Sequence, residues 1–239
     1  NFLIKEISKS AKDLSLILTV GVSAESGYLV SRYSETASNA GAEQVMVAPP
    51  IMKKPNEKVL FRYYEEVNNS INDNTKIVIQ DLPDQSGVHM SPEFMVHLDK
   101  SLEKVNSIKL EDPPTPSKIS KIVKIKSNDL KIFGGLGGLF FLEELLRGAS
   151  GTMTGFAFTE ILVQIYDLYN SKKTDDAKKL FYEWLPLIRY ENTVGISLSI
   201  RKEILKRRNI TKYSNVRYPS PSMDEDDKKE LEFILKDYL

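Results

Sequence analysis

The sequence predicts an α/β fold of the TIM (β/α)8-barrel type with a helical carboxy-terminal extension, and three observations support this prediction. Short runs rich in Val and Ile alternate with longer segments of helical periodicity. The first four runs lie about 30 residues apart, as consecutive βαβ units require. The strand signal stops after Gly155. We therefore assign residues 1–155 to the β/α-barrel portion and residues 156–239 to the helical extension.

Six apolar runs are predicted as parallel strands. They lie at 16–20, 44–48, 76–81, 105–109, 131–133 and 152–154. The helices predicted around them lie at 1–13, 24–40, 55–71, 92–98, 116–125 and 139–147. Ser91 is a predicted N-cap, and Gly41 and Gly148 stand where glycines end helices. The turn and cap residues therefore agree with the periodicity.

The extension is predicted to contain four helices. They lie at 160–170, 175–190, 194–208 and 224–238. Residues 213–223 contain two prolines and are predicted to be irregular. The basic residues between Arg201 and Arg208 alternate with apolar ones at helical spacing, which indicates a solvated face of an amphipathic helix more than an anion site.

A doubly wound open sheet is the alternative arrangement of six parallel strands. Its dinucleotide-binding members carry a glycine fingerprint after the first strand, and the loop Gly21-Val22-Ser23 lacks it. A barrel therefore fits better, with six of the eight strands in this sequence and no counterpart of the first two.

Composition excludes several classes of function. The 33 basic and 33 acidic side chains cancel, which disfavours nucleic acid as a partner. Without cysteine, the chain has no disulfide, no thiolate nucleophile and no cysteine zinc site. No apolar run reaches the length of a membrane span, so we expect a cytoplasmic protein without membrane contact.

Lys109 is the strongest candidate for a catalytic residue. Active sites of β/α barrels lie at the carboxyl ends of the strands, and Lys109 ends the fourth apolar run. Strand alternation places Ser107, Lys109 and Glu111 on one face, with Ile108 and Leu110 facing the helices. An amine inside a barrel is desolvated, which lowers its pKa and favours attack on a carbonyl. Lys109 is thus predicted to form an imine, as in class I aldolases.

Lys109 and two further features of the sequence also allow less specific interpretations. Alternatively, Lys109 forms an ion pair with Glu111 or Asp112 and has no catalytic role, since structural ion pairs also shift the pKa of lysines. The glycines at 134–138 resemble a phosphate cradle but lack the lysine of a P-loop, so a tight turn is the simpler interpretation. His89 and His97 are not predicted to meet, and we expect no metal site.

Four segments resemble the dihydrodipicolinate synthase and N-acetylneuraminate lyase family. They are 41–50, 79–93, 107–112 and 148–155, and the similarity extends over nearly the whole chain. The resemblance implies that Lys109 forms the Schiff base with pyruvate or another 2-keto acid. It also implies substrate contacts at Gln80, Gly135 and Met153, and it requires no organic cofactor.

The sequence departs from that family's pattern at three places. Gln80 stands where the family has its proton-relay tyrosine, and an amide does not titrate as a phenol does. Gln85 stands where the synthases have the arginine that holds the carboxylate of their aldehyde substrate. The loop that binds the 2-keto-acid carboxylate has no counterpart here.

These features predict a lyase that cleaves, condenses or dehydrates a Schiff-base intermediate. A sugar-derived 2-keto-3-deoxy acid fits better than aspartate semialdehyde because the arginine is missing. The resemblance implies a homodimer or homotetramer. The competing hypothesis is a catalytically silent barrel retained for ligand binding or assembly, since Gln80 replaces tyrosine and the carboxylate-binding loop has no counterpart.

Overall fold

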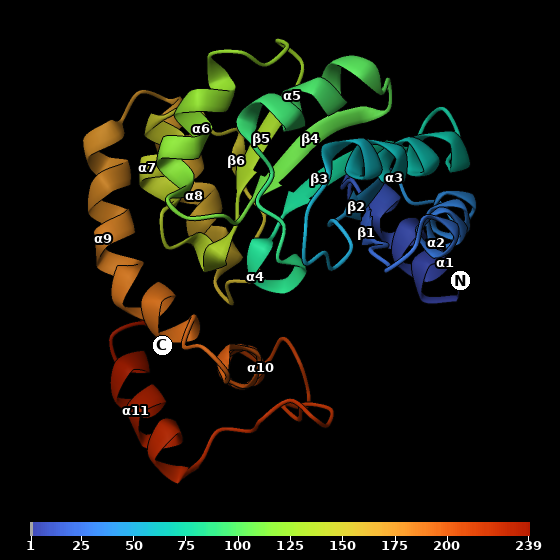
Figure 1. Ribbon diagram of the computed structural model, residues 1–239. Helices are drawn as coiled ribbons and strands as arrows, with labels where there is room; N and C mark the ends of the chain where they lie inside the picture. The colour runs from blue at the N-terminus through green and yellow to red at the C-terminus, as the bar shows by residue number, and fades with distance from the viewer. Residues whose placement is uncertain (1) are drawn as a thin grey trace. The chain divides into compact units, whose positions relative to one another are not determined.

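The structure is a computed structural model that describes residues 2–239 (Figure 1). Asn1, which was predicted to begin the first helix, lies outside the described residues. The elements follow the predicted alternation of helices and strands. They are α1 (Phe2–Asp13), β1 (Thr19–Gly21), α2 (Gly27–Asn39), β2 (Gln44–Val47), α3 (Glu57–Ser70), β3 (Lys76–Asp81), α4 (Pro83–Ser86), α5 (Pro92–Ser101), β4 (Val105–Leu110), α6 (Thr115–Val123), β5 (Lys131–Gly134), the 3-10 helix η1 (Leu136–Gly138), α7 (Phe141–Leu146), β6 (Gly151–Thr152), α8 (Thr159–Asn170), α9 (Thr174–Glu191), α10 (Ser197–Arg207) and α11 (Glu225–Leu235).

The described chain divides into two compact units. The first runs as far as Phe133 and also includes Arg147–Ser150. The second consists of Gly134–Leu146 and Gly151–Leu239. The first unit holds the paired strands β1 to β4 with their connecting helices, and the second unit holds the helices from α7 onward.

The strands of the sheet follow one another in sequence order. Parallel pairing joins β1 to β2, β2 to β3 and β3 to β4. The helices α2, α3, α5 and α6 form a row in which each packs on the next, along one side of these strands (Figure 1). Sequential parallel strands with all crossover helices on one face are typical of a β/α barrel, whereas a doubly wound sheet reverses its strand order. The alternative of an open doubly wound sheet is therefore wrong.

Strand alternation sorts apolar and polar side chains to opposite faces of the first unit. The side chains that face the helices are almost completely buried in one apolar core. From the strands this core includes Val45, Val47, Ile77, Ile79, Ile108 and Leu110, and from the helices Leu60, Val67, Leu98, Ile119 and Ile122. Because Lys109 lies between Ile108 and Leu110 in an extended strand, its side chain leaves from the opposite face.

The helix ends of the first unit confirm the predicted cap residues. The Ser91 hydroxyl accepts a hydrogen bond from the Phe94 backbone N–H at 3.0 Å, which satisfies a free donor in the first turn of α5. Gly41, after α2, has a φ of +103°, a left-handed conformation that a side chain would strain.

The structure differs from the prediction at the weakest apolar runs. The first strand begins at Thr19, and the side chains of Leu16 and Ile17 before it are exposed. The last strand spans only Gly151–Thr152. The one-turn helix α4 follows Leu82, and it is too short to produce a helical periodicity in sequence.

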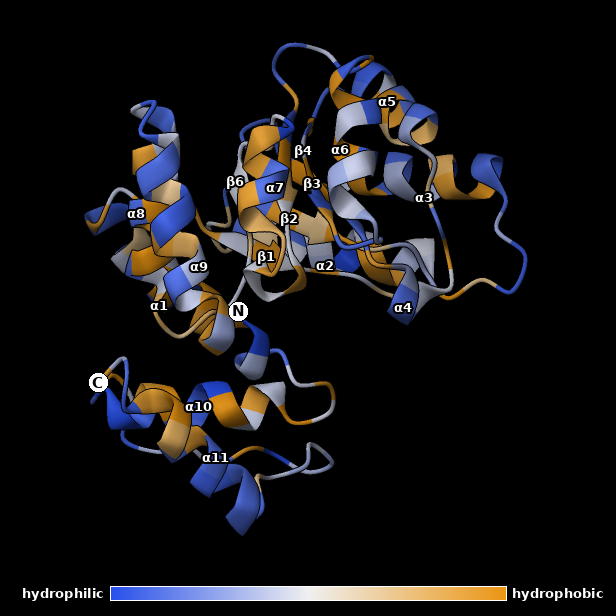
Figure 2. Cartoon of the chain, turned by 90° about the vertical axis from the view of Figure 1, so that its left-hand side faces the viewer, coloured by the Kyte–Doolittle hydropathy of each residue, from blue (hydrophilic) through white to orange (hydrophobic). Residues whose placement is uncertain are grey.

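The second unit is built from amphipathic helices around a separate core. In Figure 2 both orange hydrophobic and blue hydrophilic residues occur along its helices. Its core centres on aromatic residues, including Phe141, Phe156 and Phe181. The last helix begins at a capping box, in which the side chains of Asp224 and Asp227 each accept a hydrogen bond from the other residue's backbone N–H. None of the described helices is long and apolar enough to cross a membrane.

The first testable prediction concerns the helix-facing side of β4. Leu110→Ala removes a fully buried side chain and should lower the free energy of unfolding by about 2–5 kcal/mol, measured by urea denaturation. Leu14→Ala, at a leucine that is 68% exposed, is the control and should change it by less than about 0.5 kcal/mol. Equal effects of the two changes would contradict the placement of Leu110 in the core.

Candidate functional site

The candidate site lies where β3 and β4 end side by side. In their parallel register Gln80 is opposite Lys109, and Asp81 is opposite Leu110. The Glu111 backbone N–H continues the pairing beyond β4 by donating to the Asp81 carbonyl oxygen at 2.9 Å. The carboxyl ends of both strands are thus held at the same level, which is where β/α barrels place their reactive groups.

Three polar side chains meet on the face opposite the helices. The Glu111 Oε1 atom lies 3.3 Å from the Lys109 Nζ atom. The Gln80 Nε2 atom donates a hydrogen bond to Glu111 Oε2 at 2.8 Å. The side chains of Lys109 and Glu111 are 15% and 12% exposed, so little water reaches the pair. The structure thus brings the predicted residues Lys109 and Gln80 together, with Glu111 as the link.

The ion pair of Lys109 decides between the two partners that the sequence offered. Lys109 pairs with Glu111, whereas Asp112 turns to the other side and pairs with Lys118 and His89. An ion pair of this kind is compatible with a structural lysine and with a catalytic one. Whether Lys109 is structural or catalytic depends on whether the Glu111 carboxylate accepts a proton from it when a carbonyl substrate binds.

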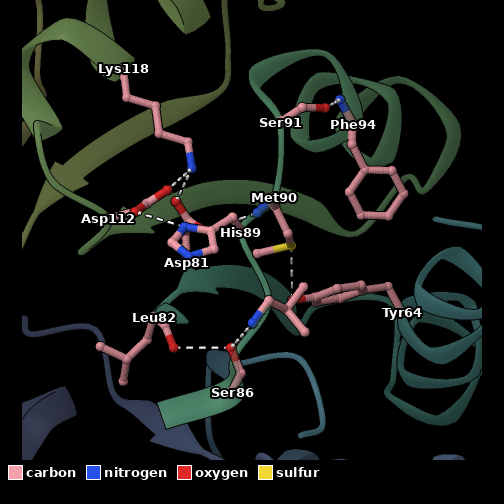
Figure 3. Close-up of polar contacts among 11 residues, drawn as sticks. Tyr64, Asp81, Leu82, Ser86, His89, Met90, Ser91, Phe94, Asp112 and Lys118 are labelled. Atoms are coloured by element: carbon pink, nitrogen blue, oxygen red, sulfur yellow. Dashed lines mark hydrogen bonds and ion pairs between the residues drawn. The ribbon is translucent and has the colours of Figure 1, made fainter. Parts of the chain in front are cut away.

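A second polar network ties the same strand ends to helix α6 (Figure 3). The Lys118 Nζ atom contacts Asp81 Oδ2 at 2.5 Å and Asp112 Oδ2 at 2.8 Å. His89 Nδ1 lies 3.1 Å from Asp112 Oδ1. Asp81 is completely buried, and its Oδ1 also accepts from the Met90 backbone N–H at 3.5 Å. Lys118 therefore bridges the carboxylates of Asp81 and Asp112. These residues directly follow Gln80 and Glu111 in the sequence.

In this network the pKa values of Asp81 and Asp112 shift in opposite directions. Burial raises the pKa of Asp81, and the ammonium of Lys118 offsets only part of that rise. Burial would also raise the pKa of Asp112, but hydrogen bonds from Lys118 and His89 outweigh it and lower that pKa below its ordinary value. Asp112 is therefore the more strongly ionised partner of the bridge.

A cavity of about 400 Å³ opens beside this network in the first unit. It is lined by His89, Met90, Ser91, Pro92, Asp112, Pro113, Pro114, Ser117, Lys118 and Lys121. The lysines and Asp112 give its wall charges of both signs.

The remaining predicted site residues, Gly135 and Met153, belong to the second unit. Gly135 is buried and leads into η1, where Gly137 has a φ of +68°. The Met153 backbone N–H donates to the Gly134 carbonyl oxygen at 2.9 Å. The segment 134–138 thus forms a tight turn before the short helix α7, as the simpler interpretation of its glycines predicted.

The histidines lie apart, as the sequence indicated. His89 is 72% exposed and pairs with Asp112, while His97 stacks on the ring of Phe61 with centroids 5.2 Å apart.

Sequence reasoning missed the bridging role of Lys118. Its only signal was a lysine in the first turns of the predicted helix at 116–125, which many surface helices also have.

The second prediction tests the bridge between the strand ends and α6. Lys118→Met leaves the buried Asp81 carboxylate unpaired and should lower the free energy of unfolding by about 3–5 kcal/mol at pH 7. The loss should shrink towards pH 4, because protonation removes the charge of a carboxyl whose pKa is raised in the folded state.

The control for this prediction is Lys121→Met on the same helix, at an exposed lysine beside the same cavity. Its unfolding free energy should stay within about 0.5 kcal/mol of the unaltered protein. A Lys118→Met loss that is equal at both pH values would contradict the account of Asp81.

Comparison with curated proteins finds relatives with two related activities. L-2-keto-3-deoxyarabonate dehydratase of Azospirillum brasilense is 28% identical over 200 residues, which cover 82% of this chain and 63% of that enzyme. The 4-hydroxy-tetrahydrodipicolinate synthase of Thermosipho melanesiensis is 25% identical over 174 residues, covering 72% of this chain and 59% of that enzyme. The chain therefore spans less than two thirds of the length of these relatives.

Solved structures and family profiles agree with this relationship. The crystal structure of dihydrodipicolinate synthase from Rhodopseudomonas palustris matches with a TM-score of 0.90 at 32% identity, covering 98% of this chain and 78% of that one. The sequence model of the dihydrodipicolinate synthetase family matches residues 3–238. The chain therefore belongs to the dihydrodipicolinate synthetase family.

Proposed function

We propose that this protein is a lyase that forms a Schiff base between Lys109 and a 2-keto acid. The observation that carries the proposal is the position of Lys109 at the carboxyl end of β4, on the face away from the helices and beside Gln80 and Glu111. Membership of the dihydrodipicolinate synthetase family supports it.

The proposed chemistry begins at the keto group. The Lys109 amine attacks C2 of the substrate, the carbonyl oxygen leaves as water, and a protonated imine remains. This imine withdraws electrons from the bond between C3 and its hydrogen, or from the bond between C3 and C4. Loss of the C3 proton followed by departure of a C4 hydroxyl gives dehydration, and rupture of the C3–C4 bond gives aldol cleavage.

A 2-keto-3-deoxy sugar acid is the proposed substrate class, with dehydration as the proposed outcome. Gln85 on α4 is neutral and offers no guanidinium to hold a second carboxylate. The relative from Azospirillum brasilense, a dehydratase named for such a keto-deoxy acid, supports the same choice. The amide of Gln80 and the carboxylate of Glu111 are suitable partners for sugar hydroxyls.

Further parts of the proposal rest on the family resemblance. Gly135 and Met153 are proposed to contribute backbone contacts to the substrate, and Gln80 a side-chain contact. Assembly as a homodimer or homotetramer is proposed on the same ground. The division into a barrel portion at 1–155 and a helical extension at 156–239 also stays a prediction.

A catalytically silent barrel is the second candidate function. The observation in its favour is that the ammonium of Lys109 already has a carboxylate partner, while the neighbouring Gln80 has no titrating group. In that case Lys109 and Glu111 act as a structural pair at the strand ends.

The third prediction separates these two functions by borohydride trapping. Incubation of the full-length protein with pyruvate, or with a 2-keto-3-deoxy sugar acid, and borohydride should add one reduced keto-acid unit to the intact mass. Lys109→Ala should abolish this addition because the nucleophile is gone. Lys131→Ala, at an exposed lysine of β5, is the matched control and should be trapped like the unaltered protein.

A folded protein that gains no mass with a broad panel of 2-keto acids would favour the silent barrel. A mass gain that survives in Lys109→Ala would instead show that another lysine reacts, and would contradict the assignment of Lys109.

A further inference from the structure

We infer that Glu111 is a catalytic residue that carries protons during imine formation, and that Gln80 is the positioning residue that holds it. This inference rests on the proposed Schiff-base function of Lys109. It assigns to a carboxylate of this chain the proton transfers that an amide at position 80 cannot perform.

Imine formation from a charged lysine requires two proton transfers. The reactants are an ammonium group with three protons and a carbonyl group. The products are a protonated imine with one proton on nitrogen and a water molecule that contains the carbonyl oxygen. A C=N double bond forms, the C=O double bond breaks, and two protons move from nitrogen to oxygen. A group that accepts a proton and gives it back, twice, therefore completes the step without consuming or releasing protons overall.

The geometry provides such a group at Glu111. Its Oε1 atom faces the Lys109 Nζ atom at 3.3 Å, a separation from which a small side-chain shift gives a hydrogen bond. Its Oε2 atom is occupied by the Gln80 amide at 2.8 Å. One oxygen is thus held while the other faces the reacting nitrogen. The low exposure of both side chains limits the supply of water as a competing proton carrier.

The backbone around Glu111 is fixed from both sides. Its own N–H donates to the Asp81 carbonyl oxygen, and the next residue, Asp112, is bound by Lys118 and His89 on the helix-facing side. Asp81 and Asp112 point towards Lys118 of α6 and away from the pair. Among the described residues of the first unit, the ion pair of Glu111 is with Lys109. This ion pair therefore lies on the opposite face of the strands from the network around Lys118.

The fourth prediction is a change in the pH dependence of trapping when the carboxylate is removed. In the unaltered protein, the rate of borohydride-trapped adduct formation with pyruvate should be nearly constant around neutral pH, because the proton passes within the pair. In Glu111→Gln the ammonium must lose its proton to solvent. Its rate should fall about 100-fold at pH 7 and rise about tenfold per pH unit.

Three further variants separate proton transfer from structural damage. Glu111→Asp keeps a carboxylate and should keep the flat pH profile at a reduced rate. Gln80→Leu removes the hydrogen bond to Oε2 and should slow trapping about tenfold with the flat profile retained, as expected for a positioning residue. Glu65→Gln, at an exposed carboxylate of α3, should match the unaltered protein, and circular dichroism checks that each variant is folded.

The results distinguish failure of this inference from failure of the proposed function. If Lys109 is trapped and Glu111→Gln shows the rate and flat profile of the unaltered protein, the role of Glu111 is overturned while the Schiff base stands. If Glu111→Asp shows the steep profile of Glu111→Gln, a carboxylate role is likewise overturned. If the unaltered protein is not trapped at Lys109 at all, the proposed function fails and the inference falls with it.

Discussion

The lateral pairing of β3 with β4 at their carboxyl ends is the constraint on which the site depends. The register that sets Gln80 opposite Lys109 also brings Glu111 to both of them, since its backbone continues the ladder to Asp81. A slip of one residue would turn every side chain of β4 to the other face and bury the lysine among the helices. The chemistry proposed for Lys109 therefore follows from a backbone hydrogen-bond pattern.

Strand alternation places the polar side chains at the ends of β3 and β4 on two opposite faces, where they have different roles. Lys109, Gln80 and Glu111 gather on one face, while Asp81 joins Lys118 on the helix side. A buried carboxylate such as Asp81 is costly without a cation, so the Lys118 bridge offsets a penalty that the apolar core would otherwise impose. The same bridge fixes the residue after Glu111. The Lys118 bridge therefore stabilises the helix layer and also helps to place the Lys109–Glu111 pair, because Asp112 directly follows Glu111.

Much of this arrangement could be predicted from the sequence, and the exceptions have physical causes. Both limits of strand β3 were predicted correctly because a continuous apolar run ends there on polar residues. The orientation of Lys109 followed from alternation alone. Alternation placed Glu111 on the face of Lys109, but the partner of Lys109 remained open because Glu111 lies beyond β4, where the backbone is held by a hydrogen bond to Asp81. Lys118 lies 37 residues from Asp81, and local sequence patterns do not predict a contact between residues so far apart.

The most direct test of the Schiff base at Lys109 is a crystal structure of the full-length protein after reduction with borohydride in the presence of pyruvate. We expect continuous electron density from the Lys109 Nζ atom to C2 of the reduced keto acid, with Glu111 beside the new bond and held by Gln80. A keto acid bound elsewhere, or an unmodified Lys109 still paired with Glu111 in a protein saturated with substrate, would contradict it.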